Sequence, residues 1–151
     1  MLDKKDEPQL MDFGLAKRLA EESTMTIDGS LLGTPAYMSP EQARGDHQNV
    51  GPASDQYSVG VMLYELLTGR KPFNGAPHSV IAQVTSREPQ TIRECDPKLP
   101  IDLDAICQKA MSKEPSSRYA SSSELAEDLR AWLDGRPTRA RTPGPMERAV
   151  F

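Results

Sequence analysis

The segment Ser54–Gly69, SDQYSVGVMLYELLTG, constrains the fold of this chain more than any other stretch. Its apolar residues are too many for one helical stripe and surround the helix on all sides. Ser54 is a good N-cap and Gly69 a good stop signal, which predicts a helix over residues 54–68. Because a helix that is apolar all round is usually buried, we expect this segment to form the centre of a helical core.

Further helices are predicted on both sides of this segment. In SPEQARG, residues 39–45, Ser39 is the predicted N-cap, Pro40 occupies the first helical position and Gln42 completes a capping box. Apolar residues at helical spacing predict three more helices, over residues 77–86, 102–112 and 121–135. Residues 1–11 read as a turn and a short strand. The predicted fold class is therefore mainly α.

The composition excludes several classes of protein. The chain of 151 residues has a net charge of −4, and this acidic balance argues against a nucleic-acid partner. No apolar run approaches the ~18 residues of a membrane span. Cys95 and Cys107 form no C-x-x-C pair, so we expect neither a disulfide framework nor a zinc site.

The last residues differ from the rest of the chain. From Arg136 the sequence RPTRARTPGPMERAVF is rich in arginine and proline. This composition predicts a disordered tail or linker over residues 136–151 after a domain at residues 1–135. Its arginines could also meet acidic lipid or a partner, but a solvated linker is the simpler interpretation.

Three blocks stand in a fixed order, DFGLAKRL from Asp12, GTPAYMSPEQARG at 33–45 and SDQYSVGVMLYELLTGRKPF at 54–73. Together they resemble the C-terminal lobe of a bacterial-type serine/threonine protein kinase. The resemblance covers about residues 2–140. It implies a partial kinase domain, with the activation segment followed by helices and a short β-strand piece near the N-terminus.

The first block carries the metal chemistry of that family. Phosphoryl transfer needs Mg²⁺ to bridge phosphate oxygens, and Mg²⁺ prefers carboxylate ligands. The resemblance implies that Asp12 binds Mg²⁺ at the ATP site. It also implies that Phe13 packs to set active or inactive geometry and that Gly14 lets the backbone swing. An ordinary turn with a surface aspartate is the alternative for the tripeptide taken alone.

The second block carries the substrate side and its regulation. The resemblance implies that Thr34, in GTPAY, lines the substrate site as a catalytic-site residue. Thr24, Thr26 and Ser30 lie in the segment where activating phosphorylation occurs in many kinases, since an added phosphate can pair with arginines. Plain loop hydroxyls are the alternative for each of them.

Three charged residues have structural roles in the resemblance. Glu41, in SPEQ, is expected to form a buried ion pair with Arg118, which would anchor the activation segment. Two exposed charges worth ~0–1 kcal/mol are the alternative. Asp55 is expected to accept hydrogen bonds from the catalytic-loop backbone, or to act as a second carboxylate near the positive end of its helix.

The sequence also departs from the family pattern. It contains no G-x-G-x-x-G loop, no V-A-I-K lysine and no H-R-D aspartate. We therefore expect the chain to begin just past the catalytic loop, to bind Mg²⁺ and ATP poorly and to be inactive alone. The expected partners are protein substrates or an upstream kinase half, and a partner that covers helix 54–68. A non-catalytic protein-binding module or a decayed remnant are the alternatives.

Two further expectations follow from the resemblance and the cysteines. A cytoplasmic location fits the reducing conditions that two unpaired cysteines indicate. In the kinases that this chain resembles, a linker like residues 136–151 commonly leads to a membrane anchor. Such an anchor would lie beyond Phe151 here.

Overall fold

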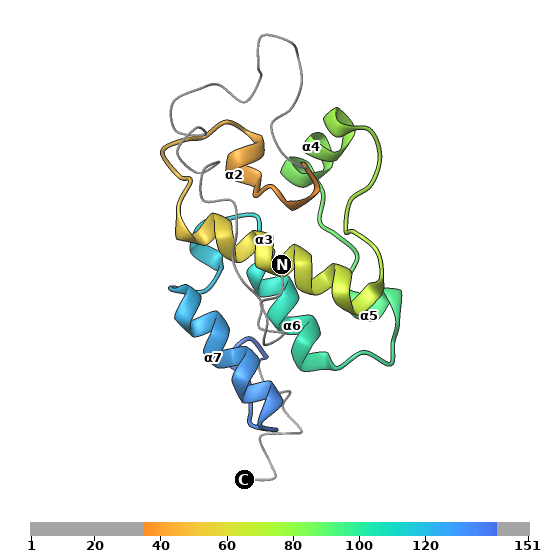
Figure 1. Ribbon diagram of the computed structural model, residues 1–151, viewed down its shortest axis with the longest axis vertical. Coiled ribbons are helices and arrows are strands. Elements are labelled where there is room, and N and C mark those ends of the chain that lie inside the picture. Colours follow the sequence, from red (N-terminus) through yellow and green to blue (C-terminus); the bar gives the residue numbers. More distant parts are fainter. Residues whose placement is uncertain (1–34, 142–151) are drawn as a thin grey trace, which may run out of the picture. The chain divides into compact units, whose positions relative to one another are not determined.

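The computed structural model describes residues 35–141, and this part of the chain is helical (Figure 1). The elements in order are the 3-10 helix η1 (Pro35–Tyr37), α2 (Pro40–Ala43), α3 (Pro52–Thr68), α4 (Pro77–Ser86), α5 (Ile92–Cys95), α6 (Ile101–Ala110), the 3-10 helix η2 (Pro115–Ser117) and α7 (Ser122–Leu133). The predicted mainly α class is confirmed for these residues. The strand expected near the N-terminus lies outside them.

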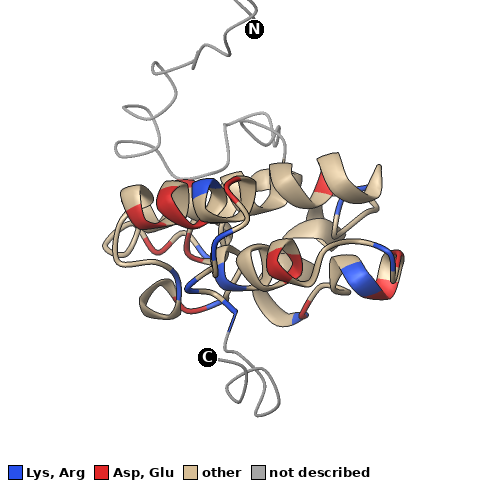
Figure 2. Cartoon of the chain, turned by 90° about the horizontal axis from the view of Figure 1, so that it is seen from below, with Lys and Arg blue, Asp and Glu red and all other residues tan. Residues whose placement is uncertain are grey.

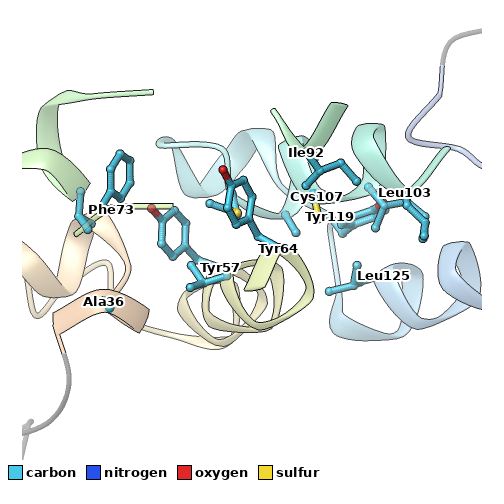
Figure 3. Close-up of a cluster of buried hydrophobic side chains, with 14 of the residues drawn as sticks. Ala36, Tyr57, Tyr64, Phe73, Ile92, Leu103, Cys107, Tyr119 and Leu125 are labelled. Atoms are coloured by element: carbon cyan, nitrogen blue, oxygen red, sulfur yellow. The ribbon is translucent and has the colours of Figure 1, made fainter. Parts of the chain in front are cut away.

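Helix α3 is the centre of the described part. It contacts η1, α5, α6, η2 and α7, and Figure 1 shows it crossing the middle of the fold between α2 and α7. Tyr57, Val61 and Tyr64 project from α3 into one continuous core. The core also holds Ala36, Phe73, Val80, Val84, Ile92, Leu103, Ile106, Cys107, Ala110, Met111, Tyr119 and Leu125, several of which Figure 3 shows around the two tyrosines.

A glycine allows α3 and α6 to approach each other closely. A Cβ atom added to Gly60 would lie 2.8 Å from Cγ of Met111 and 3.0 Å from Cβ of Ala110. These distances are shorter than ordinary van der Waals contact, so a side chain at this position would push the two helices apart.

The start of α3 corrects one sequence prediction. The helix begins at Pro52 with Gly51 as the N-cap, so the assignment of Ser54 as the cap was wrong. Proline suits the first helical position because its missing N–H would be unpaired there anyway. Ser54 lies one turn inside, where its Oγ accepts a hydrogen bond from the Gly51 N–H at 3.2 Å.

The face of α3 opposite the core carries exposed apolar residues. Val59 is 37% exposed, Met62 45% and Leu66 82%. These three residues follow helical spacing and form a stripe that we call the apolar stripe of α3. Within the described part of the chain, α3 is therefore buried on its core side and exposed along the apolar stripe.

The other predicted helices are present with small differences. Helix α2 has the expected capping box between Ser39 and Gln42. Helix α7 has Ser121 as its N-cap, and the Glu124 carboxylate accepts a hydrogen bond from the Ala120 N–H at 3.2 Å. Helix α5 was not predicted, although its capping pair, Thr91 and Glu94, follows the usual pattern.

The segment after α7 was expected to be disordered from Arg136 onwards. Residues 136–141 instead lie against α6 and α7, with Thr138 buried and the backbone N–H groups of Arg139 and Ala140 bonded to Asp128. Disorder does not apply to these six residues, and residues 142–151 lie outside the described part. The domain boundary at residue 135 stays a prediction.

We expect Gly60→Val to lower the free energy of unfolding by about 1–3 kcal/mol, because the new side chain overpacks the contact between α3 and α6. Urea unfolding followed by circular dichroism measures this effect. Leu66→Val is the control, since it places the same β-branched side chain on the exposed side of the same helix. Equal midpoints for the two variants would contradict the close approach at Gly60.

Candidate functional site

The described residues contain part of the predicted site. Asp12, Phe13, Gly14, Thr24, Thr26, Ser30 and Thr34 lie outside residues 35–141. Glu41, Asp55 and Arg118 lie within them. The described residues also include the segment that follows Thr34 and the helices that hold it.

Glu41 and Arg118 form a buried ion pair with two parallel hydrogen bonds. Nη1 of Arg118 donates to Oε1 of Glu41 at 2.8 Å, and Nη2 donates to Oε2 at 2.9 Å. The side chains are 3% and 0% exposed. The ion pair expected from the resemblance is thus present, and the alternative of two exposed charges is wrong.

The remaining hydrogen bonds of the guanidinium go to backbone carbonyls. Arg118 donates to the carbonyl oxygens of Ala53 at 2.7 Å, Ser112 at 2.9 Å and Lys113 at 3.1 Å. Its guanidinium also lies over the ring of Tyr57, 5.2 Å from the ring centre. Arg118 therefore joins α2, the start of α3 and the loop after α6 at one point.

Ser54 completes the carboxylate side of the pair. Its Oγ donates to Oε1 of Glu41 at 2.7 Å. Burial by itself raises the pKa of Glu41, but the hydrogen bonds from Arg118 and Ser54 outweigh it and lower the pKa to about 2. The glutamate is thus charged whenever the fold is intact near neutral pH.

The residues just before α2 are fixed to α3. The Tyr37 hydroxyl donates to Oε2 of Glu65 at 2.5 Å, and the Ser58 hydroxyl donates to the carbonyl oxygen of Tyr37 at 2.8 Å. The ammonium group of Lys71 lies 5.1 Å from the centre of the Tyr37 ring. Sequence reasoning did not find these contacts, because the partners lie 21 and 28 residues apart without a shared motif.

Two cations hold the C-terminal end of α4. Arg44 donates to the carbonyl oxygen of Thr85 at 3.1 Å, and Lys113 donates to that of Val84 at 2.8 Å. Positive groups stabilise a helix at this end, where carbonyl groups are unpaired. Burial lowers the pKa of Lys113 to about 8. Arg44, three residues after Glu41, and Lys113, five residues before Arg118, thus position α4 as well.

Asp55 lies in the first turn of α3 and is exposed. Its place near the positive end of the helix fits the role of a favourable carboxylate there. It precedes Val59 by one turn, so the exposed face of α3 begins with Asp55 and continues along the apolar stripe. The contact of Asp55 with a catalytic loop stays a prediction.

The described residues assign no metal site and no membrane segment. Among residues 35–141, no group of three or more His, Cys, Asp or Glu side chains is placed to hold a metal ion. Within the same residues, no helix is both long enough and apolar enough to cross a membrane. Figure 2 shows basic and acidic residues mixed over the helices in that view.

Comparisons with known proteins show what this chain is similar to. A sequence model described as the protein kinase domain matches residues 1–130. A probable serine/threonine-protein kinase of Streptomyces coelicolor is 43% identical over 142 residues, which cover 93% of this chain and 21% of that protein. The serine/threonine-protein kinase PknB of Mycobacterium leprae is 39% identical over 141 residues, 93% of this chain and 22% of that protein. The chain thus spans about a fifth of the length of these relatives.

We expect acid to weaken the fold through Glu41. The pKa of its carboxyl group is 4.5 without partners and about 2 in the fold, so this stabilisation is complete above pH 4.5. It falls as the pH drops from 4.5 to 2, by on the order of 3 kcal/mol. Urea unfolding at a series of pH values measures this loss.

Glu41→Gln is the control for this prediction, because its amide does not titrate. Other carboxyl groups titrate equally in both proteins, so the difference between their unfolding free energies isolates Glu41. That difference should be largest at pH 7 and shrink toward pH 2. A difference that stays constant over this range would show that the Glu41 charge contributes nothing.

Proposed function

The chain belongs to the protein kinase family, and from this premise we propose that it is part of a serine/threonine kinase. Such a kinase transfers the γ-phosphate of ATP to serine or threonine hydroxyls of protein substrates. In this proposal the chain supplies the activation segment and the helical base on which that segment rests.

The observation that carries this proposal is the Glu41–Arg118 pair. It fixes α2, which follows directly on the proposed substrate-binding segment around Thr34. The Tyr37 contacts to α3 fix the residues between the two. A kinase needs such a rigid base because phosphoryl transfer relies on positioning more than on covalent chemistry.

We assign the chemical roles by resemblance to residues before η1. Asp12 would bind Mg²⁺ in the loop with Phe13 and Gly14, and Thr34 would line the site of the substrate hydroxyl. When Mg²⁺–ATP is bound, the metal neutralises charge that develops on the phosphate oxygens. Phosphorylation of the Thr24–Ser30 segment would regulate the kinase by adding charge that pairs with arginines.

We further propose that these 151 residues do not transfer phosphate by themselves. They contain neither the glycine-rich loop nor the lysine that holds ATP phosphates, and they lack the H-R-D aspartate that serves as the base. Positioning supplies ~7–11 kcal/mol of the barrier reduction in such reactions, and a general base adds ~10²–10⁴ in rate.

Two free thiols, Cys95 and Cys107, support a cytoplasmic location, where ATP is at hand.

The exposed face of α3 supports a binding role in either case. Asp55 and the apolar stripe form a surface that begins with a hydrogen-bond acceptor and continues with three apolar side chains. We propose that the catalytic-loop half of the kinase covers this surface. If the chain instead serves as a non-catalytic binding module, the same surface is where its protein partner binds.

We expect the chain alone to show no transfer of labelled phosphate from Mg²⁺–ATP to a generic protein acceptor. A chimera that places the N-terminal part of the Streptomyces coelicolor kinase domain, up to its catalytic loop, before Met1 should transfer phosphate. Asp12→Asn in the chimera should lower the rate by at least ~10², since it removes the metal ligand. Transfer by the chain alone, or an unaffected Asp12→Asn chimera, would refute the proposal.

We expect Leu66→Asp to lower the activity of the same chimera at least tenfold. The change would bury an unpaired carboxylate under the catalytic-loop half, which costs several kcal/mol. Leu133→Asp is the matched control, because Leu133 is 73% exposed on α7. Both variants should keep the unfolding midpoint of the 151-residue chain, which excludes misfolding as the cause of a loss. Equal activities of the two chimeras would show that the stripe is not covered.

A further inference from the structure

The six residues that follow the last helix turn are held by side chains of α6 and α7. We call residues 136–141 the strap. Thr138 is buried, and Ala140 is half-buried against the core. The matching kinase-domain model ends at residue 130, so the strap lies beyond the residues that this model matches.

Asp128 on α7 is the main anchor of the strap. Its side chain is buried, and its two oxygens accept hydrogen bonds from consecutive backbone N–H groups of the strap. Oδ1 accepts from Arg139 at 2.5 Å and Oδ2 from Ala140 at 2.9 Å. The Tyr119 hydroxyl donates to Oδ2 at 2.8 Å. Two of the three hydrogen-bond partners of this carboxylate thus lie in the strap.

Asp102 on α6 is the other anchor. Its Oδ1 accepts from the Thr138 hydroxyl at 2.9 Å, and its Oδ2 accepts from Arg141 at 3.3 Å. Arg139 adds an exposed ion pair to Glu127 at 3.0 Å. Asp102 and Asp128, on two neighbouring helices, therefore bind this short segment through four hydrogen bonds.

The strap is held by these polar contacts more than by packing. A hollow of about 220 Å³ lies between it and α7, lined by Glu127, Asp128, Arg130, Ala131, Arg136, Pro137 and Arg139. Several water molecules fit in such a space. Ala140 is the residue of the strap that packs against the apolar core, so opening of the strap breaks fewer apolar contacts than opening of the core.

We propose that residues 136–141 are a releasable strap, closed by Asp102 and Asp128, which sets the point where the chain leaves the helical base. When it is closed, residue 141 lies beside Asp102 on α6. When it is open, the chain leaves from the end of α7 at Gly135. Opening breaks the Thr138–Asp102 hydrogen bond and two of the three hydrogen bonds of Asp128, so weakening either anchor favours the open state.

Limited digestion of the 151-residue chain with trypsin tests this proposal. The peptide bonds after Arg139 and Arg141 are cleavable, whereas Pro137 protects the bond after Arg136. Cleavage after Lys109, inside α6, reports global unfolding in the same sample. A synthetic peptide of residues 134–151 gives the rate for an unprotected strap.

Two variants weaken one anchor each. Asp128→Asn places an amide N–H₂ against one of the two backbone N–H groups, and Thr138→Val removes the hydrogen bond to Asp102. Asp134→Asn is the control, because its partner Arg136 is an exposed side chain and both side chains are about 60% exposed. Amide hydrogen exchange at Arg139 and Ala140 provides a readout that does not depend on the protease.

We expect the native chain to be cleaved after Arg139 at least ~10-fold more slowly than the peptide. Asp128→Asn should remove most of this protection and Thr138→Val part of it, because a hydrogen bond to a charged acceptor contributes about tenfold to the closing equilibrium. Cleavage after Lys109 should be unchanged in Thr138→Val. Asp134→Asn should behave as the native chain. Equal rates for the native chain and the peptide, or protection unaffected by both anchor variants, would overturn the proposal.

Discussion

The buried Glu41–Arg118 pair is the interaction on which the rest of the described structure depends. Removing two charges from water is costly, and the cost is recovered only if the pair is well aligned and the remaining donors are satisfied. Both conditions hold, since the two hydrogen bonds are parallel and three carbonyl oxygens accept the others. Loss of either partner would leave the other charge buried and unpaired. The contact between α2 and the loop after α6, whose paired residues lie 77 positions apart in the sequence, therefore depends on both residues.

Helix α3 transmits this constraint to both of its faces. Near its start, the Ala53 carbonyl oxygen accepts a hydrogen bond from Arg118 and the Ser54 hydroxyl donates one to Glu41. These two bonds fix the rotation of the helix about its axis. That rotation turns Gly60 toward α6, where the helices meet with no room for a side chain. It also turns the apolar stripe outward. Helix α3 is apolar all round, but residues 35–141 cover only one of its sides. It thus has the composition of a buried helix and the exposed apolar surface of an interface.

The features that could be predicted from the sequence are those with local causes. Caps and apolar periodicity predicted α2, α4, α6 and α7 because both act within one or two turns. The start of α3 was placed wrongly because Gly51-Pro52 and Ser54 both satisfy the rules for a helix start. The ion pair came from the family resemblance, since nothing near Glu41 points to Arg118. The strap could not be predicted, because Asp128 binds backbone N–H groups, which every residue except proline carries.

The two ends of the described part are held with different strength, and this difference follows from burial. At the start, Glu41 and Arg118 are almost fully enclosed, so water does not compete for their hydrogen bonds and salt screens them little. At the end, the ion pairs of Arg139 lie in solvent and the strap covers a hollow. Local opening begins where few apolar contacts must be broken. Within residues 35–141, the part around the ion pair is therefore rigid, whereas the segment after α7 needs less energy to open.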